Sequence, residues 1–191
     1  MQTVDTNRAA WPAALGGVLA FIAVIWVVFV FDRLLPLEQF GLVPRQLRGL
    51  LGIFAMPLLH GDFNHLLANT TPLAFLLLLL IGSRTRNTEV VVSLWLISGA
   101  LLWLFGREAL HIGASSLVFA LGSFLIVTGV MERRLLSFAV AVLVTAVYGT
   151  SFFAGIAPWQ SGVSWDGHLA GLVGGGLLAP LALRRHEKKY R

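Results

Sequence analysis

The sequence predicts an all-α polytopic membrane protein built as a bundle of six transmembrane helices. Hydrophobic residues make up 57% of the 191 residues and charged residues only 12%, whereas a soluble domain carries about 25% charged residues. The apolar residues also gather into six separate segments, and a bilayer crossing takes about 20 such residues. An interior alone cannot hold so many apolar side chains, so we expect the surrounding solvent to be lipid.

The six predicted spans follow one another along a single domain of residues 1–191. They lie near residues 13–31, 64–82, 89–105, 115–131, 135–153 and 167–183. Only Arg8 and no small-residue cleavage site accompany the first span, so we expect an uncleaved span and not a signal peptide. The fourth and sixth spans contain internal Gly and Ser, which is typical of helices that pack against other helices.

Two segments outside the spans have a distinct composition. Residues 32–58 combine arginines with an apolar run that Gly52 and Pro57 interrupt. We interpret this segment as an interfacial first loop that lies on the outer leaflet, and an ordinary extracellular loop is the alternative. Residues 184–191 form a basic tail, which we expect in the cytoplasm.

The charge pattern indicates an orientation. The net charge is +5, but the basic residues sit in short loops and at the C-terminus, which favours membrane topology over nucleic-acid binding. With both termini in the cytoplasm, ten of the 14 Lys and Arg residues lie on the cytoplasmic side, as the positive-inside rule requires. The absence of cysteine excludes disulfides and thiolate chemistry.

Polar residues gather where the even-numbered spans begin. Polar side chains inside a membrane are costly and therefore mark functional sites. The segment HGDFNHLLAN supplies His60, His65 and Asn69, the segment GASS supplies Ser115 and Ser116, and the segment WDGHLAGLVGG supplies His168. In the predicted orientation the even-numbered spans begin at the outer face, so all of these residues share one layer near that face.

The spacing within these segments predicts a close contact between the fourth and sixth spans. Gly167, Gly171 and Gly175 recur every four residues, and such a stripe allows helices to approach closely. We expect the fourth span as partner, with Ser115 Oγ within about 3–3.5 Å of a His168 ring nitrogen.

A serine and a histidine in this arrangement can hydrolyse an acyl bond. The serine hydroxyl needs a base to take its proton, and a neutral histidine can take it and later return it to the leaving group. Asp166 is two residues from His168, on the opposite side of a helical turn, so we predict a Ser–His dyad and not a triad. The Ser115 N–H at a helix N-terminus, the Asn69 amide and a His65 ring N–H are candidate oxyanion donors.

Together, HGDFNHLLAN, GASS and HLAGLVGG resemble the rhomboid family of intramembrane serine proteases, and the resemblance covers residues 13–183. That family carries H-x4-H-x3-N on its second helix, G-x-S-G on the fourth and H-x-x-G-x-x-x-G on the sixth. The resemblance implies that Ser115 is the nucleophile and His168 the base. The implied oxyanion hole comprises His65, Asn69 and the backbone at Ser115.

The resemblance further implies a structural hydrogen-bonding role for His60 and supporting roles for Gly113 and Gly171. It implies substrates that span the membrane once, with no cofactor and no metal. Short termini favour a bacterial plasma membrane as the location, with the active site towards the outside.

Two positions depart from the family pattern. Ser116 stands where the family has glycine, which leaves open that Ser116 shares or disturbs the role of the nucleophile. Phe119 stands where many relatives carry a tyrosine against the base. A phenylalanine ring can still pack on His168 but cannot hydrogen-bond.

Other classes of protein stay open. A metal-dependent membrane hydrolase would use His60, His65, His168 and Asp62 as ligands, although the H-E-x-x-H motif is absent. A non-catalytic relative would bind membrane clients. A transporter would need an internal repeat, and no convincing one is present. We assign no role to His111 or His186, and we expect Arg107 and Glu108 to form a solvated loop pair.

Overall fold

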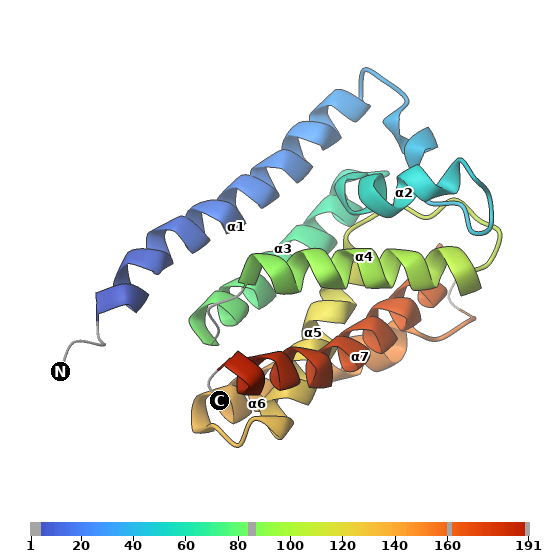
Figure 1. Cartoon of the computed structure of the whole chain (residues 1–191). Helices are drawn as coiled ribbons and strands as arrows, with labels where there is room; N and C mark the ends of the chain where they lie inside the picture. Colours follow the sequence, from blue (N-terminus) through green and yellow to red (C-terminus); the bar gives the residue numbers. More distant parts are fainter. Residues whose placement is uncertain (1–4, 84–86, 160–161, 190–191) are drawn as a thin grey trace.

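The computed structural model describes residues 5–83, 87–159 and 162–189. Within these ranges the chain forms only helices, which confirms the all-α prediction (Figure 1). The α-helices are α1 (Asp5–Asp32), α2 (Gly49–Ala55), α3 (Phe63–Ser83), α4 (Asn87–Phe105), α5 (Ser115–Met131), α6 (Leu135–Gly155) and α7 (Trp165–Lys189). Two 3-10 helices, η1 (Leu37–Phe40) and η2 (Met56–Leu58), flank α2.

Each of the six predicted spans lies within one of these helices. Among the described residues, the helices long and apolar enough to cross a membrane number five, namely α1, α3, α4, α6 and α7. The fourth predicted span coincides with α5, which has 17 residues and is shorter than the other five. The sixfold crossing and the orientation of the termini therefore stay predictions. The predicted tail from residue 184 continues α7 as far as Lys189, and residues 190–191 lie outside the described residues.

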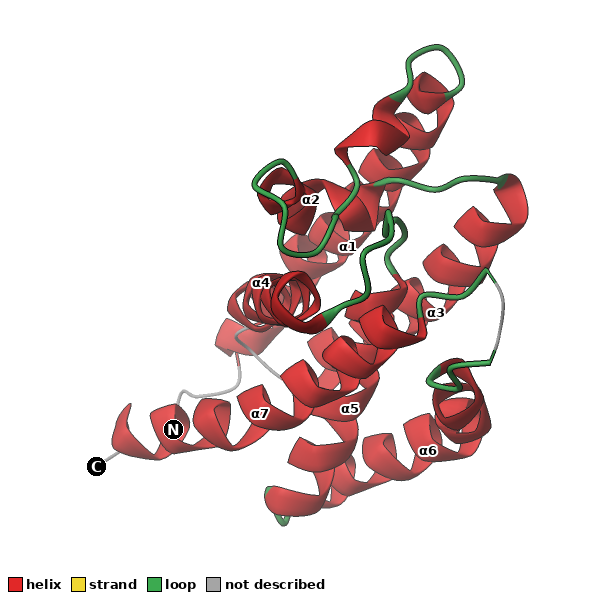
Figure 2. Cartoon of the chain, turned by 90° about the vertical axis from the view of Figure 1, so that its right-hand side faces the viewer, coloured by secondary structure: helices red, strands yellow, loops and turns green. Residues whose placement is uncertain are grey.

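The helix α5 is the centre of the bundle. Its side chains Leu117, Leu121 and Phe124 have no exposed surface, and Figure 2 shows α5 between α6 and α7. A short helix is tolerated here because its neighbours, and not lipid, surround it.

Glycines on α7 bring its backbone against that of α5. A Cβ atom at Gly171 would collide with the carbonyl oxygen of Ser116, and one at Gly175 with that of Ala120. The predicted contact between the fourth and sixth spans is thus confirmed at these two glycines. Gly167 differs, because it lies against Ser164 and against Leu102 of α4.

The helix α1 lies at one side of the bundle, next to α3 (Figure 1). Val18 and Ile25 face the bundle, while Leu19 on the outer face is 62% exposed. Phe21 stacks on Trp95 of α4 with ring centroids 5.5 Å apart. Large side chains, and not backbone approach, therefore make this contact.

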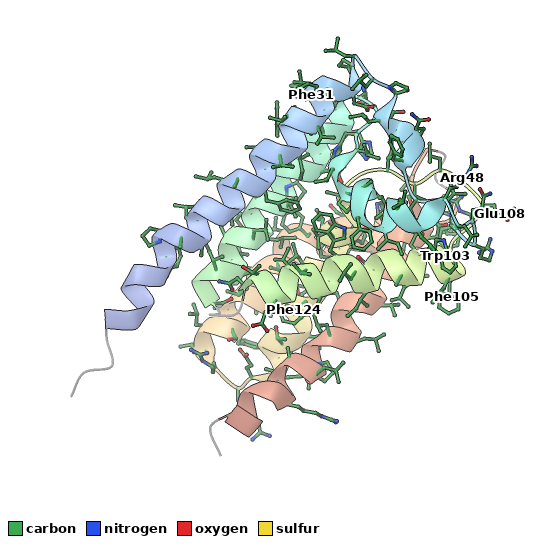
Figure 3. All side chains as sticks on the ribbon, turned by 45° about the horizontal axis from the view of Figure 1, so that its top comes forward. Phe31, Arg48, Trp103, Phe105, Glu108 and Phe124 are labelled. Carbon is green, nitrogen blue, oxygen red and sulfur yellow. The ribbon has the colours of Figure 1, made fainter. Side chains whose placement is uncertain are left out.

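The first loop contains α2, whose two faces differ. Gly49 and Gly52 lie directly against the backbone of Val43 and Leu42, whereas Leu51 and Phe54 are 65% and 60% exposed. The indole N–H groups of Trp95 and Trp103 on α4 donate to the Ile53 carbonyl (2.7 Å) and the Gln46 carbonyl (3.0 Å). Figure 3 labels Trp103 and Arg48 at this end of the molecule. The loop is thus fastened to α4, with an apolar face turned outward.

Candidate active site

The turn before α5 requires glycine at position 113. Gly113 has φ +107°, and its N–H donates to the Met56 carbonyl at 2.9 Å. A Cβ atom here would lie 2.6 Å from His65 Nε2. Residues with a Cβ atom rarely adopt this backbone conformation. A Cβ atom at position 113 would also have no room. Gly113 therefore lets His65 of α3 lie against the segment that enters α5.

The two serines at the start of α5 have different surroundings. Ser115 is the first residue of α5 and is partly exposed. Ser116 is 2% exposed, and its hydroxyl has no hydrogen-bond partner among the described residues. Its carbonyl is covered by Gly171 of α7. Ser115 is thus the accessible hydroxyl, and the geometry gives no support to a nucleophilic Ser116.

His168 lies in the first turn of α7, and two other helices hold its ring. Its Nδ1 is 2.7 Å from the carbonyl oxygen of Gly155, the last residue of α6. Because a carbonyl only accepts hydrogen bonds, Nδ1 carries the hydrogen, and in the neutral ring Nε2 is left as the basic nitrogen. Phe119 of α5 stacks on the ring with centroids 4.1 Å apart and planes 10° from parallel. Phe119 therefore packs on His168, as a phenylalanine ring at this position can.

The crossing of α5 and α7 brings together the chain neighbours of Ser115 and His168. Gly171 lies one turn after His168 and contacts the carbonyl of Ser116, the neighbour of Ser115. No hydrogen bond joins Ser115 Oγ to His168 within the described part of the chain, so the expected bond is not made here. Catalytic hydrogen bonds are often long in sites without substrate and shorten when substrate binds.

His65 and Asn69 approach the same turn from α3. Asn69 is 4% exposed, and its Nδ2 donates to the His65 carbonyl at 2.8 Å. This bond uses one amide hydrogen and leaves the second for another acceptor. Asn69 Oδ1 has no partner among the described residues. The Ser115 N–H, in the first turn of α5, adds a backbone donor to this region.

His60 and Asp62 precede α3, and both contact His65. His60 has no exposed surface, and its ring meets that of His65 edge-on with centroids 5.1 Å apart. Neither ring nitrogen of His60 makes a hydrogen bond of good geometry to a described residue. The Leu58 backbone is close enough to the ring to oppose the lowering of its pKa, so the hydrogen bond that the resemblance implied is at most a weak one. Burial and the neighbouring His65 lower the pKa of His60 to about 4.

Asp62 caps the start of α3. Its Oδ1 accepts the His65 backbone N–H at 2.9 Å, as a helix N-cap does, and this bond lowers the pKa of Asp62. Among the described residues, no group of three or more His, Asp and Glu side chains is placed to hold a metal ion. The proposed metal ligands therefore do not form a cluster.

The structure corrects the predictions for three residues near the site. Arg107 does not pair with Glu108 as expected, because its Nη2 lies 3.1 Å from Asp166 Oδ1. Asp166 is accordingly a buried ion-pair partner. His111, to which we assigned no role, is 3% exposed and shares a 2.7 Å hydrogen bond with Ser164 Oγ. The acidic residue Asp166, one residue before the predicted sixth span, was the sequence signal of this cluster.

The comparisons with known proteins agree with these motifs. The family model described as Rhomboid domain matches residues 47–185. The uncharacterized protein Rv1337 of Mycobacterium tuberculosis is 34% identical over 201 residues, covering 99% of this chain and 83% of that protein. The uncharacterized protein ML1171 of Mycobacterium leprae is 32% identical over 202 residues, covering 100% of this chain and 79% of that protein. The chain therefore belongs to the rhomboid family, and it is an integral membrane protein.

Proposed function

We propose that the chain is an intramembrane serine endopeptidase that hydrolyses peptide bonds of membrane proteins with a single span. The observation that carries this proposal is the crossing of α5 and α7. There an accessible serine at a helix N-terminus accompanies a histidine whose Nδ1 is already engaged by Gly155 (2.7 Å). Membership of the rhomboid family supports the same chemistry.

The reaction begins when His168 Nε2 takes the Ser115 hydroxyl proton as Oγ attacks the carbonyl carbon of the scissile bond. The resulting imidazolium gives that proton to the leaving amine, which departs and leaves an acyl group on Ser115. A water molecule then attacks the acyl carbon and loses its proton to His168. The bond between the acyl carbon and Ser115 Oγ breaks, His168 returns the proton to Oγ, and the new carboxylic acid departs.

The carbonyl of Gly155 replaces the carboxylate of a triad. In a triad the third residue holds the histidine in the correct tautomer and orientation. Here Gly155 accepts from Nδ1, and Phe119 fixes the plane of the ring. A dyad is therefore sufficient, because backbone and aromatic packing together orient the base.

The tetrahedral intermediate needs donors for its oxyanion. The Ser115 N–H, the second Asn69 amide hydrogen and the His65 ring N–H are the groups that supply them in this proposal. Removing one such donor typically costs about 3–4 kcal/mol of barrier.

The membrane provides both the setting and the substrate. We place the site towards the outer side of a bacterial plasma membrane, with both termini in the cytoplasm, as the charge pattern predicts. The exposed face of α2, with Leu51 and Phe54, would then lie in the outer leaflet. In this proposal no cofactor takes part.

Cleavage of a fluorescent single-span substrate by purified protein tests the proposal. We expect Ser115→Ala and His168→Ala each to lower kcat by about 10⁴-fold or more. The matched control Ser116→Ala should keep activity within a few-fold of the parent. Cleavage that survives Ser115→Ala would refute the dyad. A parent that cleaves none of several substrates would favour a non-catalytic, client-binding relative.

A further inference from the structure

A buried polar cluster lies beside the candidate site, where α7 begins. The Asp166 side chain is 7% exposed. It accepts from the backbone N–H of Arg107 at 2.7 Å and from Arg107 Nη2 at 3.1 Å. Ser164 Oγ donates to the same carboxylate at 3.4 Å. A carboxylate taken out of water is stabilised only when it is paired and hydrogen-bonded in this way.

His111 completes the cluster from the other side. Its Nδ1 is 2.7 Å from Ser164 Oγ, and its Nε2 is 3.1 Å from the Arg107 carbonyl and 3.8 Å from Asp166 Oδ2. Its backbone pairs with Leu42 of the first loop through hydrogen bonds of 2.8 and 2.9 Å. The cluster therefore joins the segment between α4 and α5 to both α7 and the first loop.

The buried polar cluster lies close in sequence to both Ser115 and His168. His111 precedes Ser115 by four residues, and Asp166 precedes His168 by two. Phe119 and Gly155 orient the His168 ring, but neither holds residues 106–114 against the start of α7. The bonds of Asp166 to Arg107 and of His111 to Ser164 make this connection. The Arg107 guanidinium adds a 3.3 Å hydrogen bond to the Val163 carbonyl and lies over the Trp165 ring.

We propose that Asp166 is a positioning residue for the hydrolysis, an inference that rests on the proposed function. Its carboxylate holds the segment that leads to Ser115 in register with the helical turn that carries His168. It touches no reacting atom and sets the separation of the nucleophile and the base through the backbone. A change of about 1 Å in such a separation costs on the order of 100-fold in rate.

Asp166→Asn is the direct test, because asparagine keeps the size of the side chain and removes its charge. We expect kcat to fall about 10- to 100-fold while KM for a single-span substrate stays within about twofold. The matched control is Glu108→Gln, which removes an exposed acid from the same region (Figure 3). It should leave both constants unchanged.

Arg107→Ala provides a graded second variant. It removes the guanidinium but keeps the backbone N–H that donates to Asp166 at 2.7 Å. Its guanidinium side chain is half exposed, and such pairs contribute little, so we expect kcat to fall only about two- to fivefold. This variant also carries the test if Asp166→Asn does not fold.

A second measurement does not depend on activity. The chain has no cysteine, so spin labels can be placed at Leu110→Cys and Val173→Cys. Both positions are exposed, the first in the segment between α4 and α5 and the second on α7. We expect a narrow distribution of distances between the labels in the parent and a broader one after Asp166→Asn.

These readouts separate the two proposals. Unchanged kcat in Asp166→Asn, or a distance distribution as narrow as in the parent, overturns the positioning role. A fall in kcat that is matched by Glu108→Gln overturns it too, because any loss of negative charge would then have sufficed. A parent that cleaves nothing refutes the proposed function and with it the positioning role of Asp166 in the hydrolysis. In that case a broadened distance distribution would still show that Asp166 ties the two segments together.

Discussion

The helices α1 and α7 are both apolar, yet they meet their neighbours in opposite ways. The most apolar stretch of α1 has a mean hydropathy of 2.8, and 11% of its residues are buried. That of α7 has a mean hydropathy of 1.2, and 39% of its residues are buried. Large side chains join α1 to the bundle, and bare backbone at Gly171 and Gly175 joins α7 to α5. Among the five described helices that are long enough to span a membrane, the most apolar one is thus the least buried.

This difference shows where a membrane protein places its chemistry. A high hydropathy predicts that a helix lies in the membrane. It does not drive tight packing between helices, because lipid is as apolar as a leucine side chain. Close packing comes from small residues, and here it accompanies the polar residues Ser115 and His168. Changes at the α5–α7 crossing should therefore affect both stability and activity. Changes on α1 should affect stability alone.

The largest effect on activity, together with a loss of stability, is expected from Gly171→Ala. The added methyl group would collide with the Ser116 carbonyl, which is backbone and cannot turn aside. We expect a loss of about 1–3 kcal/mol or more in the free energy of unfolding and activity near the detection limit. Thermal unfolding in detergent and cleavage assays measure both quantities.

Gly176→Ala is the control on the same helix. Its Cβ would lie 3.6 Å from Ser123 Oγ, which is an ordinary contact. This variant should resemble the parent, and equal losses in the two variants would contradict the role of close approach at Gly171.

The buried His60 near the site predicts that the free energy of unfolding depends on pH. The pKa of His60 is lowered to about 4 in the folded protein, against about 6.5 in the unfolded chain. The unfolded chain therefore binds more protons between these values, and stability falls as the pH drops from about 6.5 towards 4. The loss should reach up to about 3 kcal/mol.

Denaturant unfolding at pH 7.5 and pH 4.5 measures this loss. His60→Leu removes the titrating ring, so the difference between the two pH values should shrink in that variant. An equal difference in the parent and in His60→Leu would show that other groups cause the effect.

Smaller effects on activity and stability are expected when an aromatic stack is removed at the α5–α7 crossing or on α1. Phe119 stacks on His168, and Phe21 of α1 stacks on Trp95. Such pairs contribute about 0.5–1.5 kcal/mol beyond the area they bury. Phe119→Leu should lower kcat about two- to tenfold, whereas Phe21→Leu should lower only stability. Loss of activity in both variants would erase the distinction between the two regions.

The smallest effect is expected on the outer face of α1. Leu19 is 62% exposed, so Leu19→Ala should change the free energy of unfolding by less than about 0.5 kcal/mol. Ile25→Ala, at a fully buried position of the same helix, should cost about 2–5 kcal/mol. Similar costs at both positions would mean that the outer face of α1 is covered.

Apolar runs and glycine spacing predicted the helices and their central contact. The ranges of α3 to α7 follow from apolar runs bounded by polar turns, and the α5–α7 contact follows from Gly171 and Gly175. The helix α2 was not predicted, because Gly49 and Gly52 weaken an isolated helix. In the structure these glycines allow backbone contact with residues 42–43.

The remaining features of the site depend on partners that a side-chain pattern does not reveal. The acceptor for His168 is the backbone carbonyl of Gly155, and any residue type can supply a carbonyl. Arg107 pairs with Asp166, 59 residues away, although Glu108 is its neighbour in the chain. The path of the loop decides that pairing, and local spacing does not encode the path.

Covalent labelling of the active serine tests the central claim most directly. The purified parent is treated with a fluorophosphonate, which reacts with serines that a base activates, and the modified residue is identified by mass spectrometry. We predict a single adduct on Ser115, retained in Ser116→Ala and lost in His168→Ala. An adduct on Ser116, or labelling of Ser115 that persists without His168, would contradict the proposed dyad.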